Sequence, residues 1–269
     1  MHSLEFWKQV RDNDYAVPAD TNPPELLPEL LEMLGSPDPF VRDRVAYHVL
    51  AHWLERDQFS DETKRGLLPV LEAKLHLGLG EQGTETVFSR SFACLIFAVL
   101  VSLHNEKPYL AADQIHHLLE LALDYLEREQ DLRGYEPRQG WVHAVAHCAD
   151  WLDEHANVEG VEAQHLSLIL NALARKTEVE TVYFFDEEDR LAYAAARAIH
   201  RQVLSTEDVK TWATNLATRV SVADEQKTNR VRRHNAKGFL RGVHFYLDEL
   251  GTDPSYLRAI RDGLTALSL

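Results

Sequence analysis

The feature that most constrains the fold of this chain is a helical period of apolar residues that recurs in paired segments along almost the whole sequence. Apolar residues follow the 3.6-residue repeat of amphipathic helices, and the only β-rich stretch is the short TVYFF at 181–185. The second segments of successive pairs begin near residues 38, 84, 139, 187 and 228, which are 46, 55, 48 and 41 residues apart. HEAT-type helical repeats have a period of about 40 to 47 residues.

This pattern predicts an all-α fold, a right-handed α-solenoid or α-α superhelix of about five HEAT-like helix pairs plus a C-terminal helix. Because no low-complexity linker interrupts the pattern, we expect one domain over residues 1–269. In a solenoid the second helices of the pairs stack side by side and line one face. The expected pairs and the final helix cover residues 24–56, 60–104, 111–156, 161–204, 206–250 and 253–267.

Charge and composition restrict the partners and the compartment. The net charge of −15 argues against a nucleic-acid or anionic-membrane partner, because both are bound through clustered Lys and Arg. The longest apolar run, residues 92–103, is shorter than the roughly 20 residues that span a bilayer, and no signal peptide opens the chain. Two isolated cysteines, Cys94 and Cys148, fit a reducing compartment. We therefore expect a cytoplasmic protein.

Residues 133–154, RGYEPRQGWVHAVAHCADWLDE, concentrate histidines and acids. At 100° per residue, His143, His147, Asp150 and Glu154 share one narrow helical stripe. No Lys or Arg occurs from Gln139 to Ala174, so no cation competes with a bound ion there. Neutral imidazole and carboxylate are ligands for divalent metals. His143, His147 and Asp150 are thus possible ligands for Zn, Mn or Fe, with hydrogen-bonding groove residues and solvated surface as alternatives.

The repeat register suggests a wider binding groove. Arg44, Arg90 and His143 align at the same position of successive second helices, and Asp189 and Arg190 lie near that position in the fourth. The alternative is a structural ladder, in which such arginines bridge neighbouring repeats. The candidate groove residues are Arg44, Arg90, Arg133, Trp141, His143, His147, Asp150, Asp189 and Arg190.

Several stretches resemble a bacterial family described as domain of unknown function 2785. The stretch DLRGYEPRQGWVHAVAHCADWLDE is similar to the family pattern Asp-x-Arg-Gly-Tyr/Phe followed by Gly-Trp-x-His-x-x-x-His-x-x-Asp, and VFSRSFACLIFAVL is similar to its Arg-Ser-Phe segment. Cys148 departs from the small residue expected there. The resemblance covers about residues 25–250 and implies an all-helical bacterial protein, but it implies no activity. The matched positions are Asp131, Arg133, Gly134, Tyr135, Gly140, Trp141, His143, His147, Asp150, Arg90, Ser91 and Phe92.

Three functions remain open on the sequence. The first is a binding protein whose concave groove holds a small anionic ligand or a peptide, gripped by arginines and by hydrogen-bonding histidines. The second is a metal-dependent, hydrolase-like enzyme built on His143, His147 and Asp150. The third is a protein–protein scaffold without pocket chemistry.

Overall fold

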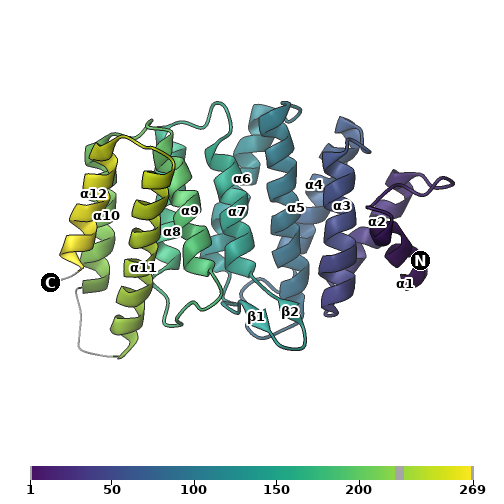
Figure 1. The fold of residues 1–269 in the computed structure, drawn as a ribbon, viewed down its shortest axis with the longest axis horizontal. Helices are drawn as coiled ribbons and strands as arrows, with labels where there is room; N and C mark the ends of the chain where they lie inside the picture. Colours follow the sequence, from purple (N-terminus) through teal and green to yellow (C-terminus); the bar gives the residue numbers. More distant parts are fainter. Residues whose placement is uncertain (1, 222–226, 268–269) are drawn as a thin grey trace.

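The fold is all-α, with helices packed in sequential pairs (Figure 1). The computed structural model describes residues 2–221 and 227–267, and these ranges hold twelve α-helices, one π-helix and a two-stranded hairpin. The helices are α1 Leu4–Asp12, α2 Pro23–Met33, η1 Phe40–Tyr47, α3 His48–Glu55, α4 Asp61–Leu75, α5 Thr86–Glu106, α6 Ala112–Arg128, α7 Ala144–Ala156, α8 Ala163–Lys176, α9 Glu187–His200, α10 Thr206–Ser221, α11 Lys227–Glu249 and α12 Pro254–Ala266. The strands are β1 Tyr135–Glu136 and β2 Gly140–Trp141.

The second helices of the pairs form one layer and the first helices form another. Helices α3, α5, α7, α9 and α11 stand side by side toward the viewer in Figure 1, and α4, α6 and α8 lie behind them. Within the layer of second helices, each helix from α3 to α9 packs against the next one in that layer. Helix α12 packs against α10 and α11. We call the exposed side of the α3–α11 layer the front face.

The sequence accounts for the helix boundaries in local terms. The Ser60 side chain accepts a hydrogen bond from the Thr63 N–H and so caps α4, and Pro23 opens α2, where a missing N–H costs little. Gly251, with φ of 65°, follows α11. The residues of each expected pair hold at least two helices, in the first pair α2 followed by η1 and α3, while α1 was not predicted.

The main hydrophobic core runs through both layers, from Trp7 in α1 to Leu267 after α12, and a smaller cluster holds Val87, Phe88, Val142 and Ala144. The central helix α5 has 21 residues and is long and apolar enough to cross a membrane by length and composition. In the fold, 72% of its most apolar stretch is buried, as expected for a core helix of a helical protein. The run at 92–103 is thus part of a longer helix. Cys94 and Cys148 are both free and buried.

The third pair departs most from the prediction. Its second helix begins at Ala144 instead of near 139, because residues 135–141 form a hairpin in which Tyr135 pairs with Trp141. Gly140 permits this turn through its φ of 73°, and an added Cβ would lie 2.8 Å from the Cβ of Pro39. The TVYFF stretch at 181–185 is a loop. This loop and the hairpin lie together at the lower edge of Figure 1.

Candidate functional site

His143 lies just before α7, where it is the N-cap residue in a left-handed conformation with φ of 45°. A non-glycine residue pays for this conformation, so its surroundings must hold it there. The carbonyl of Gly134 accepts hydrogen bonds from the N–H groups of Val142 and His143. The predicted helix thus does not include His143, since α7 begins at Ala144, but the His143 ring still lies beside that of His147.

The imidazole of His143 has one fixed proton. Its Nε2 lies 2.9 Å from the carbonyl oxygen of Phe185, which can only accept, so Nε2 carries the hydrogen. The side chain is 9% exposed, and its burial lowers its pKa to about 4. The ring is therefore neutral at pH 7, and its Nδ1 keeps a free lone pair.

His147 is likewise a neutral ring with one fixed proton, and its contact with Ser91 decides which nitrogen carries that proton. The Ser91 hydroxyl donates its one hydrogen to the carbonyl of Val142, so it accepts from Nδ1 of His147, 2.9 Å away. Burial holds the pKa of His147 well below its usual range, with a smaller contribution from the charge of His143. The lone pair of His147 is therefore on Nε2.

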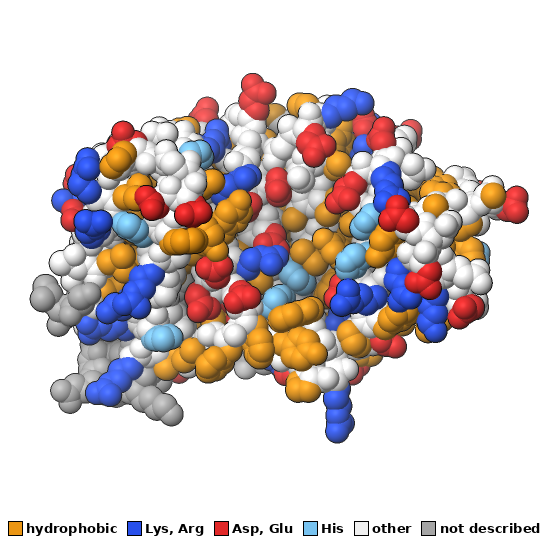
Figure 2. Space-filling view, viewed as in Figure 1, with side chains coloured by type: hydrophobic (Ala, Val, Ile, Leu, Met, Phe, Trp, Pro, Cys, Tyr) orange, Lys and Arg blue, Asp and Glu red, His pale blue; other side chains and the backbone are white. Residues whose placement is uncertain are grey.

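The two histidines thus form an imidazole pair, His143 and His147, with ring centres 5.6 Å apart. Within the described ranges, Nδ1 of His143 and Nε2 of His147 have no hydrogen-bond partner. Both residues are buried, with His143 9% and His147 5% exposed. Figure 2 shows pale-blue histidine side chains at the middle of the front face. The pair offers two hydrogen-bond acceptors to a ligand.

Asp150 does not complete a metal site with the pair. Its carboxylate forms a two-pronged ion pair with Arg190 of α9, in which Nε of Arg190 lies 2.5 Å from Oδ1. A carboxylate held by a guanidinium is a poor ligand for a second cation. Across residues 2–221 and 227–267, no group of three His, Cys, Asp or Glu side chains is placed to hold a metal ion. The set of His143, His147 and Asp150 predicted for Zn, Mn or Fe is therefore not assembled.

An aromatic row passes through the imidazole pair, with Phe92 and His147 buried at its middle. It consists of Tyr47, Phe92, His147, His143 and Trp141, from η1, α5, α7 and β2. Successive ring centres lie 6.1, 5.2, 5.6 and 4.4 Å apart. Tyr47 and Trp141 are the more exposed ends, and Trp141 is 40% exposed. The row gives the acceptors an apolar, π-rich surround.

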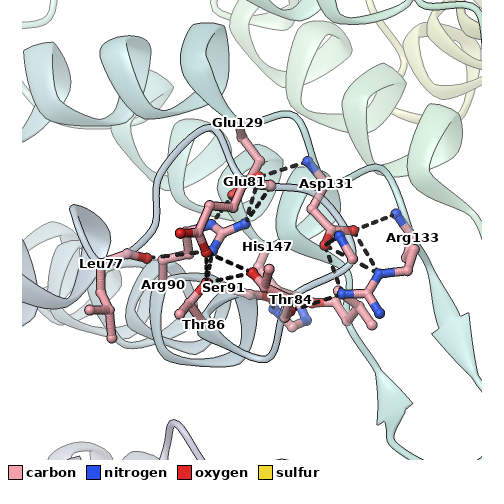
Figure 3. A network of polar contacts seen from close by, with 12 residues as sticks. Leu77, Glu81, Thr84, Thr86, Arg90, Ser91, Glu129, Asp131, Arg133 and His147 are labelled. Atoms are coloured by element: carbon pink, nitrogen blue, oxygen red, sulfur yellow. Dashed lines mark hydrogen bonds and ion pairs between the residues drawn. The ribbon is translucent and has the colours of Figure 1, made fainter.

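Most of the predicted groove arginines are already bound to carboxylates. Arg90 is fully buried, and its guanidinium makes a fork with Glu129 at 2.5 and 3.0 Å (Figure 3). Arg133 makes a similar fork with Asp131 and donates to the carbonyl of Thr84. Together with the Arg190–Asp150 pair, these contacts favour the structural ladder over ligand contacts, and the enclosed Arg90 cannot reach a ligand in a groove.

Arg44 and Asp189 differ from those arginines. Arg44 is exposed and has no ion pair with any residue that the structure describes. Asp189 is exposed on α9 and accepts a hydrogen bond from the hydroxyl of Tyr246.

Arg42 is a positioning residue that the groove prediction did not include. It is fully buried against the rings of Phe88 and Phe92 and donates to the carbonyls of Gln139 and Trp141 at 2.5 and 3.0 Å. These bonds fix the hairpin against the first helix pair. The sequence showed arginines at the start of the second helix of the first pair. It could not show that Arg42 bonds to the carbonyl of Trp141, which lies 99 residues away.

Two other residues join the site from neighbouring pairs. Ser91 fixes the tautomer of His147, as described above. Glu187, the first residue of α9, is 2% exposed, and its Oε1 lies 3.6 Å from Nε2 of His143. An acid in the first turn of a helix is common, so its sequence position alone gave no functional signal.

Comparison with known proteins shows the family. No curated protein and no solved structure matches the chain. The family model described as "Protein of unknown function (DUF2785)" matches residues 75–247, which include the Ser91 helix, the hairpin, the imidazole pair and Arg190. The chain therefore belongs to the DUF2785 family.

Proposed function

We propose that this protein is an α-solenoid of HEAT-like pairs that binds a peptide segment across its front face, at the imidazole pair. The observation that carries the proposal is the fixed tautomer of both histidines, which leaves one acceptor nitrogen on each ring in the middle of the aromatic row. Peptide N–H groups are donors that such nitrogens bind.

A peptide is favoured over the small anion that the sequence also suggested. An anion needs donors, yet the imidazole pair presents acceptors and stays neutral through burial. Arg90, Arg133 and Arg190 are each engaged by a carboxylate. The net charge of −15 adds a long-range preference for a basic peptide.

The test is selection of binding peptides from a displayed random library, followed by affinity measurements on a variant of the pair. The substitution His147→Phe keeps a ring against Phe92 and removes the Nε2 acceptor. Loss of one hydrogen bond in a partly desolvated site corresponds to about 1 to 3 kcal/mol, so selected peptides should bind the variant about 5- to 150-fold more weakly.

A matched control is His117→Phe on α6, where the histidine is exposed in the other layer. Selected peptides should bind this control as tightly as the parent protein. Equal binding to His147→Phe would contradict the proposal. A library that yields no binder, together with a His147→Phe variant that differs only in stability, would favour the scaffold hypothesis.

A further inference from the structure

A second candidate site lies outside the aromatic row, in a pocket of about 550 Å³. The pocket is lined by residues 82–83, 130–136, 181–182, 184–185 and 187. These segments come from the loop before α5, the loop and strand after α6, and the connection into α9. None of the five residues of the aromatic row lines it.

Aromatic side chains form one wall of this pocket. Tyr135, Phe184 and Phe185 are 41%, 79% and 39% exposed, and the rings of Tyr135 and Phe185 lie 6.1 Å apart. Trp141 extends the cluster, since its ring lies 4.9 Å from that of Tyr135. Figure 2 shows hydrophobic side chains gathered at the lower edge of the molecule, over the hairpin and the neighbouring loop. Open rings beside a pocket offer π-faces to a ligand.

The charges that line the pocket favour a cation. Its one lining cation, Arg133, is neutralised by the fork with Asp131, which Figure 3 shows at the end of the polar network. Glu136 and Glu187 then remain as lining carboxyl groups, and Glu136 lies 3.9 Å from Arg133 at the limit of an ion pair. The pocket therefore carries an excess of negative groups.

Glu187 supplies a further sign of a missing partner, because Nε2 of His143, 3.6 Å from its Oε1, donates to the carbonyl of Phe185 instead. Its Oε2 accepts the N–H of Phe185 at 3.1 Å, but its enclosed Oε1 has no hydrogen-bond partner among the described residues. Gly134 makes room for this oxygen, since an added Cβ would lie 2.2 Å from it. Burial also raises the pKa of Glu187, as expected for a buried acid that has no cation beside it.

We propose that this pocket binds an alkylammonium group, which is held between the aromatic wall of Tyr135, Phe184 and Phe185 and the carboxyl of Glu187. Ring faces attract ammonium groups, and a nearby carboxylate adds charge complementarity. The group can belong to a free small molecule or to a lysine side chain of a peptide.

The experiment titrates the full chain with choline and follows the aromatic resonances of Tyr135 and Phe185 by NMR. The comparison ligand is 3,3-dimethylbutan-1-ol, in which a carbon atom replaces the charged nitrogen of choline. We expect shifts at both residues and a choline Kd at least about tenfold lower than that of the neutral analogue. A parallel titration with Nα-acetyl-lysine methylamide distinguishes the sources, because tighter binding of this compound than of choline indicates a peptide lysine.

Two variants locate the effect. Glu187→Gln should remove most of the preference for choline, while Glu188→Gln, its neighbour outside the pocket, should keep it. Phe184→Ala changes a side chain that is 79% exposed, so it leaves the fold intact and should weaken choline binding several-fold. The proposal is overturned if choline and the neutral analogue bind alike, if Tyr135 and Phe185 do not shift, or if Phe184→Ala leaves the choline Kd unchanged.

Discussion

The neutral state of His143 can be tested through the pH dependence of folding. Burial lowers its pKa from 6.5 to about 4 in the folded protein. When the pH falls below 6.5, the unfolded chain takes up a proton at this residue and the folded protein does not. The stability contribution is therefore intact above pH 6.5 and is lost progressively as the pH falls toward 4.

The expected size follows from those two pKa values. One pKa unit corresponds to about 1.4 kcal/mol, so the full difference is about 3.5 kcal/mol, of which about 2.5 kcal/mol appears between pH 7 and pH 4.5. The variant His143→Asn removes the titrating group, and Asn tolerates the positive φ of this position. The stability of the wild type relative to His143→Asn should fall by about 2.5 kcal/mol over that range.

Urea unfolding of both proteins at pH 7 and pH 4.5, followed by circular dichroism, measures this difference. The comparison with a variant is needed because buried acids shift stability in the opposite direction over the same range. An exposed histidine on α6, replaced as His117→Asn, serves as the control. A wild-type-to-variant difference that stays constant within about 0.5 kcal/mol would refute the neutral, buried imidazole and with it the acceptor role.

Three other predictions concern the surroundings of the site. Arg90→Met leaves the buried carboxylate of Glu129 without its partner and should lower the free energy of unfolding by about 3 to 5 kcal/mol in urea titrations, whereas the double change Arg90→Met/Glu129→Met should cost less. Burial raises the pKa of Asp153 to about 7, so this acid lowers the stability of the fold as the pH rises from about 4 to 7. The free energy of unfolding of Asp153→Asn should therefore rise relative to that of the wild type over this range, as measured by unfolding scans. Gly134→Ala places a methyl group against Glu187 and should lower stability by about 1 to 3 kcal/mol in thermal melts.

The helix pairs could be predicted because their information is local. Apolar spacing within a segment decides which face is buried, and caps such as Ser60 decide where a helix begins. The expected pair at 60–104 contains α4 and all but the last two residues of α5, and the expected pair at 161–204 contains α8 and α9. The boundary missed by five residues, at Ala144, lies where a hairpin interrupts the helical period.

The site was harder to predict because its decisive contacts are not local. His143 and His147 were identified from spacing, but their protonation depends on Phe185 and Ser91, which lie 42 and 56 residues away. Asp150 looked available as a ligand because its partner, Arg190, lies 40 residues away on another helix. Periodicity shows which side chains share a helix face, and it does not show which of them are already paired across the stack.

The imidazole pair also depends on four successive helix pairs at once. Arg42 of the first pair and Ser91 of the second hold the backbone of residues 139–142, and the carbonyl of Phe185, from the fourth, orients His143. The left-handed backbone at His143 persists because these bonds outweigh its cost. A ligand that binds both imidazoles therefore favours the arrangement in which all four pairs are stacked, and it should stabilise that part of the fold more than the fifth pair and α12.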